Sequence, residues 1–179
     1  KETYPALLEK ITEVKILEVR GMNEVERLQE YMLLIRRAVG WSAEEFGERI
    51  GVSRQTINNL EGKRNKLTKA QYIAIRSSLD VEIRQHPEDT DMLRLILDVF
   101  VDHPENYDSN EREELLTKAN MITPSILAGT TSRKEVSKEL TSAAVAMGLI
   151  TGAMIGTIGF AMIDGVIEWL VKAVTDKRK

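Results

Sequence analysis

A chain of 179 residues holds one domain of ordinary size or two small ones, and its 42% hydrophobic and 30% charged residues exclude a globally disordered protein. The absence of cysteine excludes disulfides, thiolate nucleophiles and cysteine-based zinc sites. The net charge of −3 hides an asymmetry, because seven bases and one acid lie between Arg49 and Arg76, whereas twelve acids and four bases lie between Asp80 and Lys118. A polyanion would meet the first stretch and be repelled by the second.

The pattern of apolar residues predicts an all-α protein. These residues recur every three or four positions, and no strand-like alternation bounded by turns is present. In chain order we predict an N-terminal helix in residues 1–22, a small bundle over residues 23–84, an acidic helical linker region over residues 85–137 and an apolar helix over residues 138–176.

Cap residues place the helices within these regions. In the bundle we expect one helix from Asn23 to Gly40, short helices at 43–50 and 53–61 that begin after Ser42 and at Ser53, and a further helix that begins at Thr68. In the acidic region we expect helices at 90–101 and 109–119 and a turn at 123–124.

The two short helices, joined by Gly51, have the spacing of a helix-turn-helix. Such a pair requires a small residue where the helices cross, a turn residue that tolerates a positive φ, and apolar anchors between the helices. The crossing and turn residues are Gly47 and Gly51, and the anchors are Phe46, Ile50, Val52, Ile57 and Leu60.

The outer face of the second short helix carries side chains that recognise base edges in DNA. Arginine forks onto guanine, glutamine and asparagine pair with adenine, and threonine contacts the thymine methyl group. We predict base contacts from Arg54, Gln55, Thr56 and Asn59. We predict contacts to the DNA backbone from Ser53, Asn58, Lys63, Arg64 and Lys66.

The stretch LIRRAVGWSAEEFGERIGVSRQTINNLEGKRNKLTKAQYIAI, which begins at Leu34, resembles the Cro/C1-type helix-turn-helix domain of the Xre family of phage and bacterial repressors. The resemblance implies a lambda-repressor-like bundle of about five helices that docks its third helix in the major groove, usually as a dimer on a pseudo-palindromic operator. It also implies a buried ion pair between Arg36 and Glu61. Ala43 stands where the family often has a phosphate-binding glutamine, which leaves the backbone amides at that helix start for the phosphate.

Residues 142–163 form an uncharged stretch of 22 residues, long enough to cross a hydrocarbon layer of about 30 Å. Its glycines form a glycine-zipper pattern that allows helices to approach closely, with Gly148, Gly152 and Gly156 four residues apart and Gly159 nearby. Two interpretations remain open. The stretch is either a membrane span or a buried helix or helical hairpin in a soluble oligomer.

The sequence therefore predicts a sequence-specific DNA-binding regulator, a repressor, that binds double-stranded DNA as a homodimer or higher homo-oligomer. Its DNA-binding part would work in the cytoplasm, and the apolar helix would dimerise it or anchor it to a membrane. The alternative is a membrane-acting or assembly effector of a defence or toxin–antitoxin system, whose helix-turn-helix serves autoregulation or partner docking.

We predict no enzyme, cofactor or metal site. The sequence has no glycine-rich phosphate loop, no Ser-His-Asp set and no metal-spaced histidines. Its two histidines, His86 and His103, each precede a proline, where a helix-start or turn role is expected.

Overall fold

The computed structural model describes residues 21–146, and all the regular elements in this range are helical. The first five are α2 (Glu24–Glu30), α3 (Met32–Val39), α4 (Ala43–Ile50), α5 (Arg54–Glu61) and α6 (Lys69–Gln85). The others are α7 (Asp91–Leu97), the π-helical turn η1 (Asp98–Asp102), the 3₁₀ turn η2 (Pro104–Asn106), α8 (Ser109–Ile122), α9 (Pro124–Leu127) and α10 (Arg133–Ala146). The all-helical prediction is confirmed for this part of the chain.

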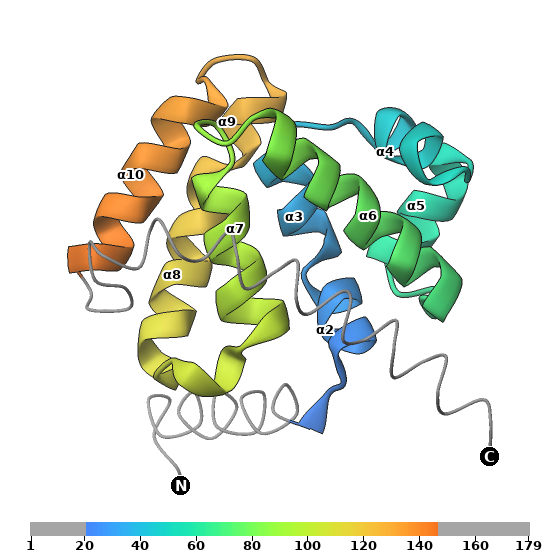
Figure 1. Ribbon diagram of the computed structural model, residues 1–179, viewed down its shortest axis with the longest axis horizontal. Coiled ribbons are helices and arrows are strands. Elements are labelled where there is room, and N and C mark those ends of the chain that lie inside the picture. Colours follow the sequence, from blue (N-terminus) through green and yellow to red (C-terminus); the bar gives the residue numbers. More distant parts are fainter. Residues whose placement is uncertain (1–20, 147–179) are drawn as a thin grey trace, which may run out of the picture.

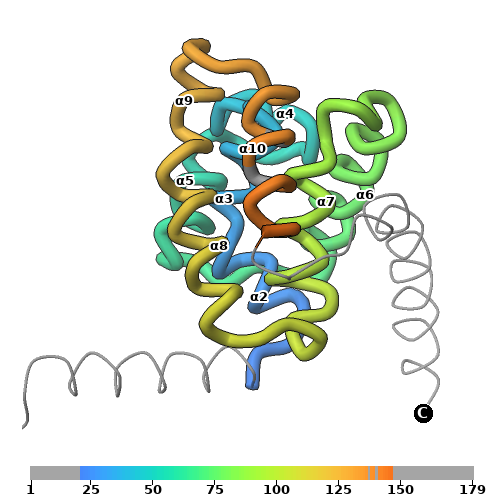
Figure 2. Tube along the Cα trace, turned by 90° about the vertical axis from the view of Figure 1, so that its left-hand side faces the viewer, coloured from blue at the N-terminus to red at the C-terminus, as the bar shows by residue number. Residues whose placement is uncertain are grey.

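The helices form two groups that share α3. Figure 1 shows α4 and α5 at one end of the molecule, α7, α8 and α10 at the other, and α2, α3 and α6 between them. α3 contacts α5 as well as α7, and α10 packs against both α7 and α8, an arrangement that is also visible in Figure 2. The helix pair α4 and α5 is therefore carried by a second layer of helices that comes later in the chain.

Side-chain caps fix where the helices begin. The side chains of Asn23, Ser42, Ser53 and Thr68 each accept a hydrogen bond from a backbone N–H in the first turn of the helix that follows. Three of these starts are full capping boxes, in which the third helical residue binds back to the cap. All four starts agree with the sequence prediction.

The helix expected from Asn23 to Gly40 is divided at Tyr31. Tyr31 has φ −103° and ψ 11°, and it ends α2 and precedes α3. Its ring packs against Phe100, with the ring centroids 4.9 Å apart. A contact of this kind joins residues far apart in the sequence, so the local apolar pattern did not predict the break.

One continuous core runs from α2 to α10, and its centre is α7 with η1. Eight apolar residues between Met92 and Val101 are at most 1% exposed. Apolar side chains cover most of the circumference of α7, with Asp91 and Arg94 as its half-buried polar residues, and a helix of this kind is a buried helix. The region over residues 85–137, named in the sequence analysis for its acidic residues, therefore supplies the central helix of the fold.

The turn expected at residues 123–124 is confined to Thr123, and Pro124 begins a short helix. Pro124 occupies the first position of α9, where its missing N–H and its fixed φ are tolerated. Thr123 already has helical backbone angles, so α8 passes almost directly into α9.

Glu82 of α6 joins three helices through its buried carboxylate, and the residue is only 4% exposed. It accepts a hydrogen bond of 2.5 Å from Nη1 of Arg133 in α10, and it lies 3.7 Å from Nη1 of Arg49 in α4. Arg133 also donates to the carbonyl of Val39, at the end of α3, over 3.1 Å. The start of α10 is therefore attached to the helix-turn-helix bundle.

None of the helices between residues 21 and 146 is long and apolar enough to cross a membrane. The first residues of the uncharged stretch, 142–146, belong to α10, and Ala144 is completely buried there. Three predictions lie outside the described residues, namely the N-terminal helix, the rest of the apolar helix, and its glycine row Gly148, Gly152, Gly156 and Gly159.

Candidate nucleic-acid interface

The turn between α4 and α5 depends on two glycines. Gly51 ends α4 with φ 73°, a left-handed conformation that side chains with a Cβ rarely adopt. At Gly47 a Cβ atom would lie 2.5 Å from the carbonyl oxygen of Val52, so the first helix has no room for a side chain where the chain enters α5. The anchors Phe46, Ile57 and Leu60 are at most 1% exposed and hold the two helices together.

The exposed face of α5 carries most of the predicted base-reading side chains. Arg54, Gln55 and Asn58 are exposed and Asn59 is half-buried, and their spacing puts them on one side of the helix. The amide Nε2 of Gln55 donates to Oδ1 of Asn59 over 3.2 Å. Thr56 lies at the margin towards the core, and its hydroxyl is 3.0 Å from that of Ser53, the N-cap.

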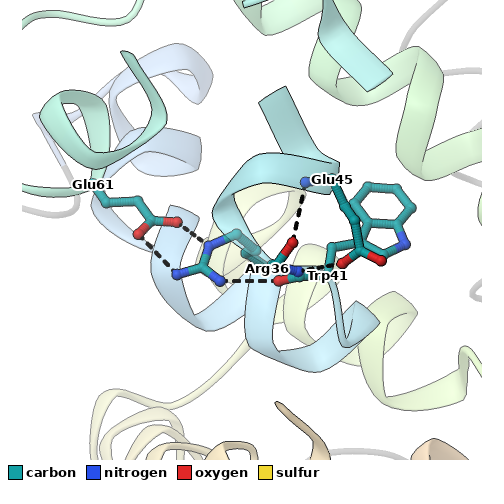
Figure 3. Close-up of polar contacts among 5 residues, drawn as sticks. Arg36, Trp41, Glu45 and Glu61 are labelled. Carbon is teal, nitrogen blue, oxygen red and sulfur yellow. Dashed lines mark hydrogen bonds and ion pairs between the residues drawn. The ribbon is translucent and has the colours of Figure 1, made fainter. Parts of the chain in front are cut away.

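A buried ion pair fixes the far end of α5, at the positions that the family resemblance implied. Arg36 of α3 donates to the Glu61 carboxylate from Nε at 2.5 Å and from Nη2 at 3.1 Å (Figure 3). Its third nitrogen, Nη1, donates to the carbonyl of Trp41 over 2.9 Å. Because Glu61 ends α5 and Trp41 directly precedes the cap of α4, one guanidinium holds both helices of the motif.

The amides at the start of α4, where a phosphate is expected, are partly engaged, since the N–H of Glu45 donates to Oγ of the cap residue Ser42 over 3.1 Å. The backbone N–H of Ser42 donates to the Glu45 carboxylate over 2.7 Å, a contact also drawn in Figure 3. Hydrogen bonds from the backbone and hydroxyl of Ser42 hold the pKa of Glu45 below its usual value. With Glu44 also exposed, two carboxylates stand at this helix start and oppose a DNA phosphate.

The basic surface is smaller than the count of bases suggests. Arg76 is 2% exposed and donates to Asp102 of η1 over 3.1 Å. The guanidinium of Arg49 lies over the Trp41 ring, 4.1 Å from its centroid. Lys63 forms an ion pair with Glu30 of α2. Arg49 and Lys63 are nevertheless exposed, as are the other four bases of this stretch, namely Arg54, Arg64, Lys66 and Lys69.

The loop after α5 begins with a Schellman closure. The N–H of Arg64 donates to the carbonyl of Asn59 over 2.9 Å, and that of Lys63 donates to Leu60 over 3.1 Å. Lys63 occupies the left-handed position of this closure, with φ 55°, where glycine is the usual residue. A lysine there carries backbone strain that glycine would not.

We expect Lys63→Gly to be more stable than Lys63→Ala by about 1 kcal/mol, because both variants lose the Glu30 ion pair but only alanine keeps the left-handed strain. Chemical denaturation measures the difference. The same two substitutions at the exposed Glu48 of α4 provide the control, where alanine is expected to be the more stable by about 1 kcal/mol. If the alanine variant were more stable than the glycine variant at Lys63 as well as at Glu48, the strain at Lys63 would be contradicted.

α2 contributes to this surface, which was not predicted from the sequence. Gln29 and Glu30 both bind the loop after α5, across separations of 31 to 38 residues. No local pattern indicates such contacts. The two histidines occupy the helix-start and turn roles expected: His103 precedes η2 as its N-cap, and the carbonyl of His86 accepts from the N–H of Asp89 in the turn that follows α6. No group of acidic and histidine side chains among residues 21–146 is arranged to hold a metal ion.

The comparisons with known proteins identify the motif. The family model for the helix-turn-helix, HTH_3, matches residues 33–85, which comprise nearly all of α3 through to α6. No curated protein and no solved structure gave a match. Residues 33–85 are therefore a helix-turn-helix domain of the Cro/C1 type, a DNA-binding class.

Proposed function

We propose that the protein is a sequence-specific DNA-binding transcription regulator, and that it represses transcription by placing α5 in the major groove of its operator. One observation carries this proposal. The exposed face of α5 presents Arg54, Gln55 and Asn58, while its opposite face is anchored in the core by Ile57 and Leu60. A rigid helix with polar donors on one side fits direct readout of base edges.

The side chains of this face have different roles in the proposal. Arg54 stands in the first turn of α5, at the end that enters the groove in this class of domain, and forks onto guanine. Gln55 and Asn59 are already hydrogen-bonded to each other, so they present their remaining amide groups in a fixed orientation for adenine. The cap residue Ser53 and Asn58 of the exposed face, with Arg64 and Lys66 on the loop, contact phosphates.

The proposed regulator works as a homodimer or higher oligomer in the cytoplasm, and the glycine-rich stretch serves as the interface between copies. One observation favours an interface over a span. Residues 142–146 belong to α10, and Ala144 is completely buried there, so the beginning of the uncharged stretch packs against the domain. If the full chain stayed in the membrane pellet after a carbonate wash, the glycine-rich stretch would be a membrane span and not an interface between copies.

Two alanine variants test the base-reading and backbone roles. On a duplex selected from a random pool by the wild-type protein, Arg54→Ala is expected to weaken binding by about 1–3 kcal/mol and to relax preference at one base pair. Arg64→Ala is expected to weaken binding to all sequences alike and to lower the slope of log K against log salt by about 1. Fluorescence anisotropy titrations over a series of salt concentrations measure both effects.

Lys118→Ala supplies the control, since Lys118 lies on α8 at the opposite end of the fold and its loss removes the same single charge as Arg64→Ala. Its affinity and salt slope are expected to stay at the wild-type values. Equal losses on every sequence from Arg54→Ala and Arg64→Ala would exclude base reading by Arg54.

A further inference from the structure

The side chain of Gln29 makes three hydrogen bonds to the end of α5 and the loop that follows it. Its amide Nε2 donates to the carbonyl of Leu60 over 3.0 Å and to the carbonyl of Asn65 over 2.6 Å. Its Oε1 accepts from the N–H of Leu67 over 2.9 Å. One glutamine in α2 therefore binds the last turn of α5 and the distal half of the loop at the same time.

Two of these hydrogen bonds enclose a single residue. Asn65 and Leu67 are the neighbours of Lys66, so Gln29 binds the carbonyl before Lys66 and the amide after it. This two-point contact fixes both peptide planes beside Lys66, while the lysine itself remains exposed. The buried side chain of Leu67, 7% exposed, holds the loop from its other side.

The rest of the loop is held independently of Gln29. The Schellman closure fixes Lys63 and Arg64 on α5, and Glu30 binds the Lys63 ammonium group. The chain between Arg64 and the cap residue Thr68 lacks that support, since its backbone contacts outside the loop are those from Gln29 and a 3.4 Å bond from Asn65 to Asn59. Gln29 thus controls the segment that carries Lys66.

We infer that Gln29 is a positioning residue for DNA binding, which orders the loop so that Lys66 reaches a phosphate of the duplex docked on α5. The inference rests on the proposed function. Phosphate contacts supply the salt-dependent part of the affinity, and a lysine on a loop already ordered binds without the entropic penalty of ordering it. Gln29 does not touch DNA and acts through Lys66.

The test measures the salt dependence of binding and the exchange of one amide in the full chain. Gln29→Ala is expected to lower the slope of log K against log salt by about 1 and to weaken binding roughly fivefold at about 0.15 M salt, with the preferred sequence unchanged. In the free protein, hydrogen exchange at the Leu67 N–H is expected to accelerate by about tenfold or more. Gln85→Ala, at the exposed end of α6, is the matched control and is expected to change neither.

A double variant separates positioning from a general loss of stability. Because Gln29 acts through Lys66, Gln29→Ala with Lys66→Ala is expected to lose no more slope than Lys66→Ala alone. Gln29→Ala with Arg54→Ala is expected to show additive losses, since Arg54 lies at the other end of α5. A purely structural effect would reduce the active fraction and leave the slope unchanged.

Each failure has a distinct signature. A wild-type protein that binds with the expected salt slope, together with an unchanged slope or an unchanged Leu67 exchange rate in Gln29→Ala, would overturn the positioning role alone. A wild-type protein that binds no duplex in a salt-dependent manner would overturn the proposed function, and this inference with it.

Discussion

Replacing Arg36 with methionine is expected to destabilise the fold by about 3–5 kcal/mol. The substitution keeps an unbranched apolar side chain but leaves the Glu61 carboxylate, 9% exposed, without its cation. It also removes the donor to the Trp41 carbonyl, which is buried. Because the Arg36 guanidinium binds both Glu61 at the end of α5 and Trp41 before α4, we expect the two helices to lose their fixed relative position. Urea denaturation followed by circular dichroism measures the change.

Two further variants show whether the loss comes from the uncompensated charge. In Arg36→Met with Glu61→Leu both charges are absent, and most of the lost stability is expected to return, because well-packed apolar residues replace a buried pair at little net change. Arg37→Met, at the half-buried next position of α3, is expected to change stability by less than about 1 kcal/mol. Additive losses at Arg36 and Glu61 would contradict the pairwise explanation.

Gly47→Val is expected to destabilise the protein by about 3 kcal/mol or more. A Cβ atom at this position would lie 2.5 Å from the Val52 carbonyl oxygen, 3.2 Å from the Ser53 carbonyl carbon and 3.3 Å from the Arg54 amide nitrogen. All three neighbours are backbone atoms, which cannot move aside as a flexible side chain does, so α5 would have to be displaced from α4. The temperature of thermal unfolding and the affinity for the operator are both expected to fall.

The matched control is Gly21→Val, where no atom of residues 21–146 lies within 4 Å of the added Cβ. Its stability is expected to differ from the wild type by less than about 1 kcal/mol, which reflects local propensity alone. If Gly47→Val were as stable as this control, the close crossing of α4 with the entry to α5 would be refuted.

The features that the sequence predicted well are those encoded within a few consecutive residues. Caps such as Ser42 and Thr68 depend on one side chain and its partner three residues away. The left-handed conformation at Gly51 depends on that single glycine. The polar face of α5 follows from helical spacing alone. These features could therefore be predicted correctly without knowledge of any tertiary contact.

Features that depend on distant pairs could not be predicted in this way. The break at Tyr31 accompanies its contact with Phe100, and Arg76 was counted in a basic patch although Asp102, 26 residues away, holds it in the interior. The region around α7 was described by its acidic residues, although α7 at its centre is the most buried helix of the fold. Net charge along a sequence does not say which charges reach the surface.

The attachment of Arg133 to Glu82 and to the Val39 carbonyl gives the chain a fixed direction of departure from the domain. The direction of α10 relative to α5 is therefore set within the fold, up to the last described residue, 146. If two copies of the proposed regulator were joined through α10, this direction would set the distance between their two α5 helices. The spacing of the operator half-sites would then depend on α10 as well as on α5.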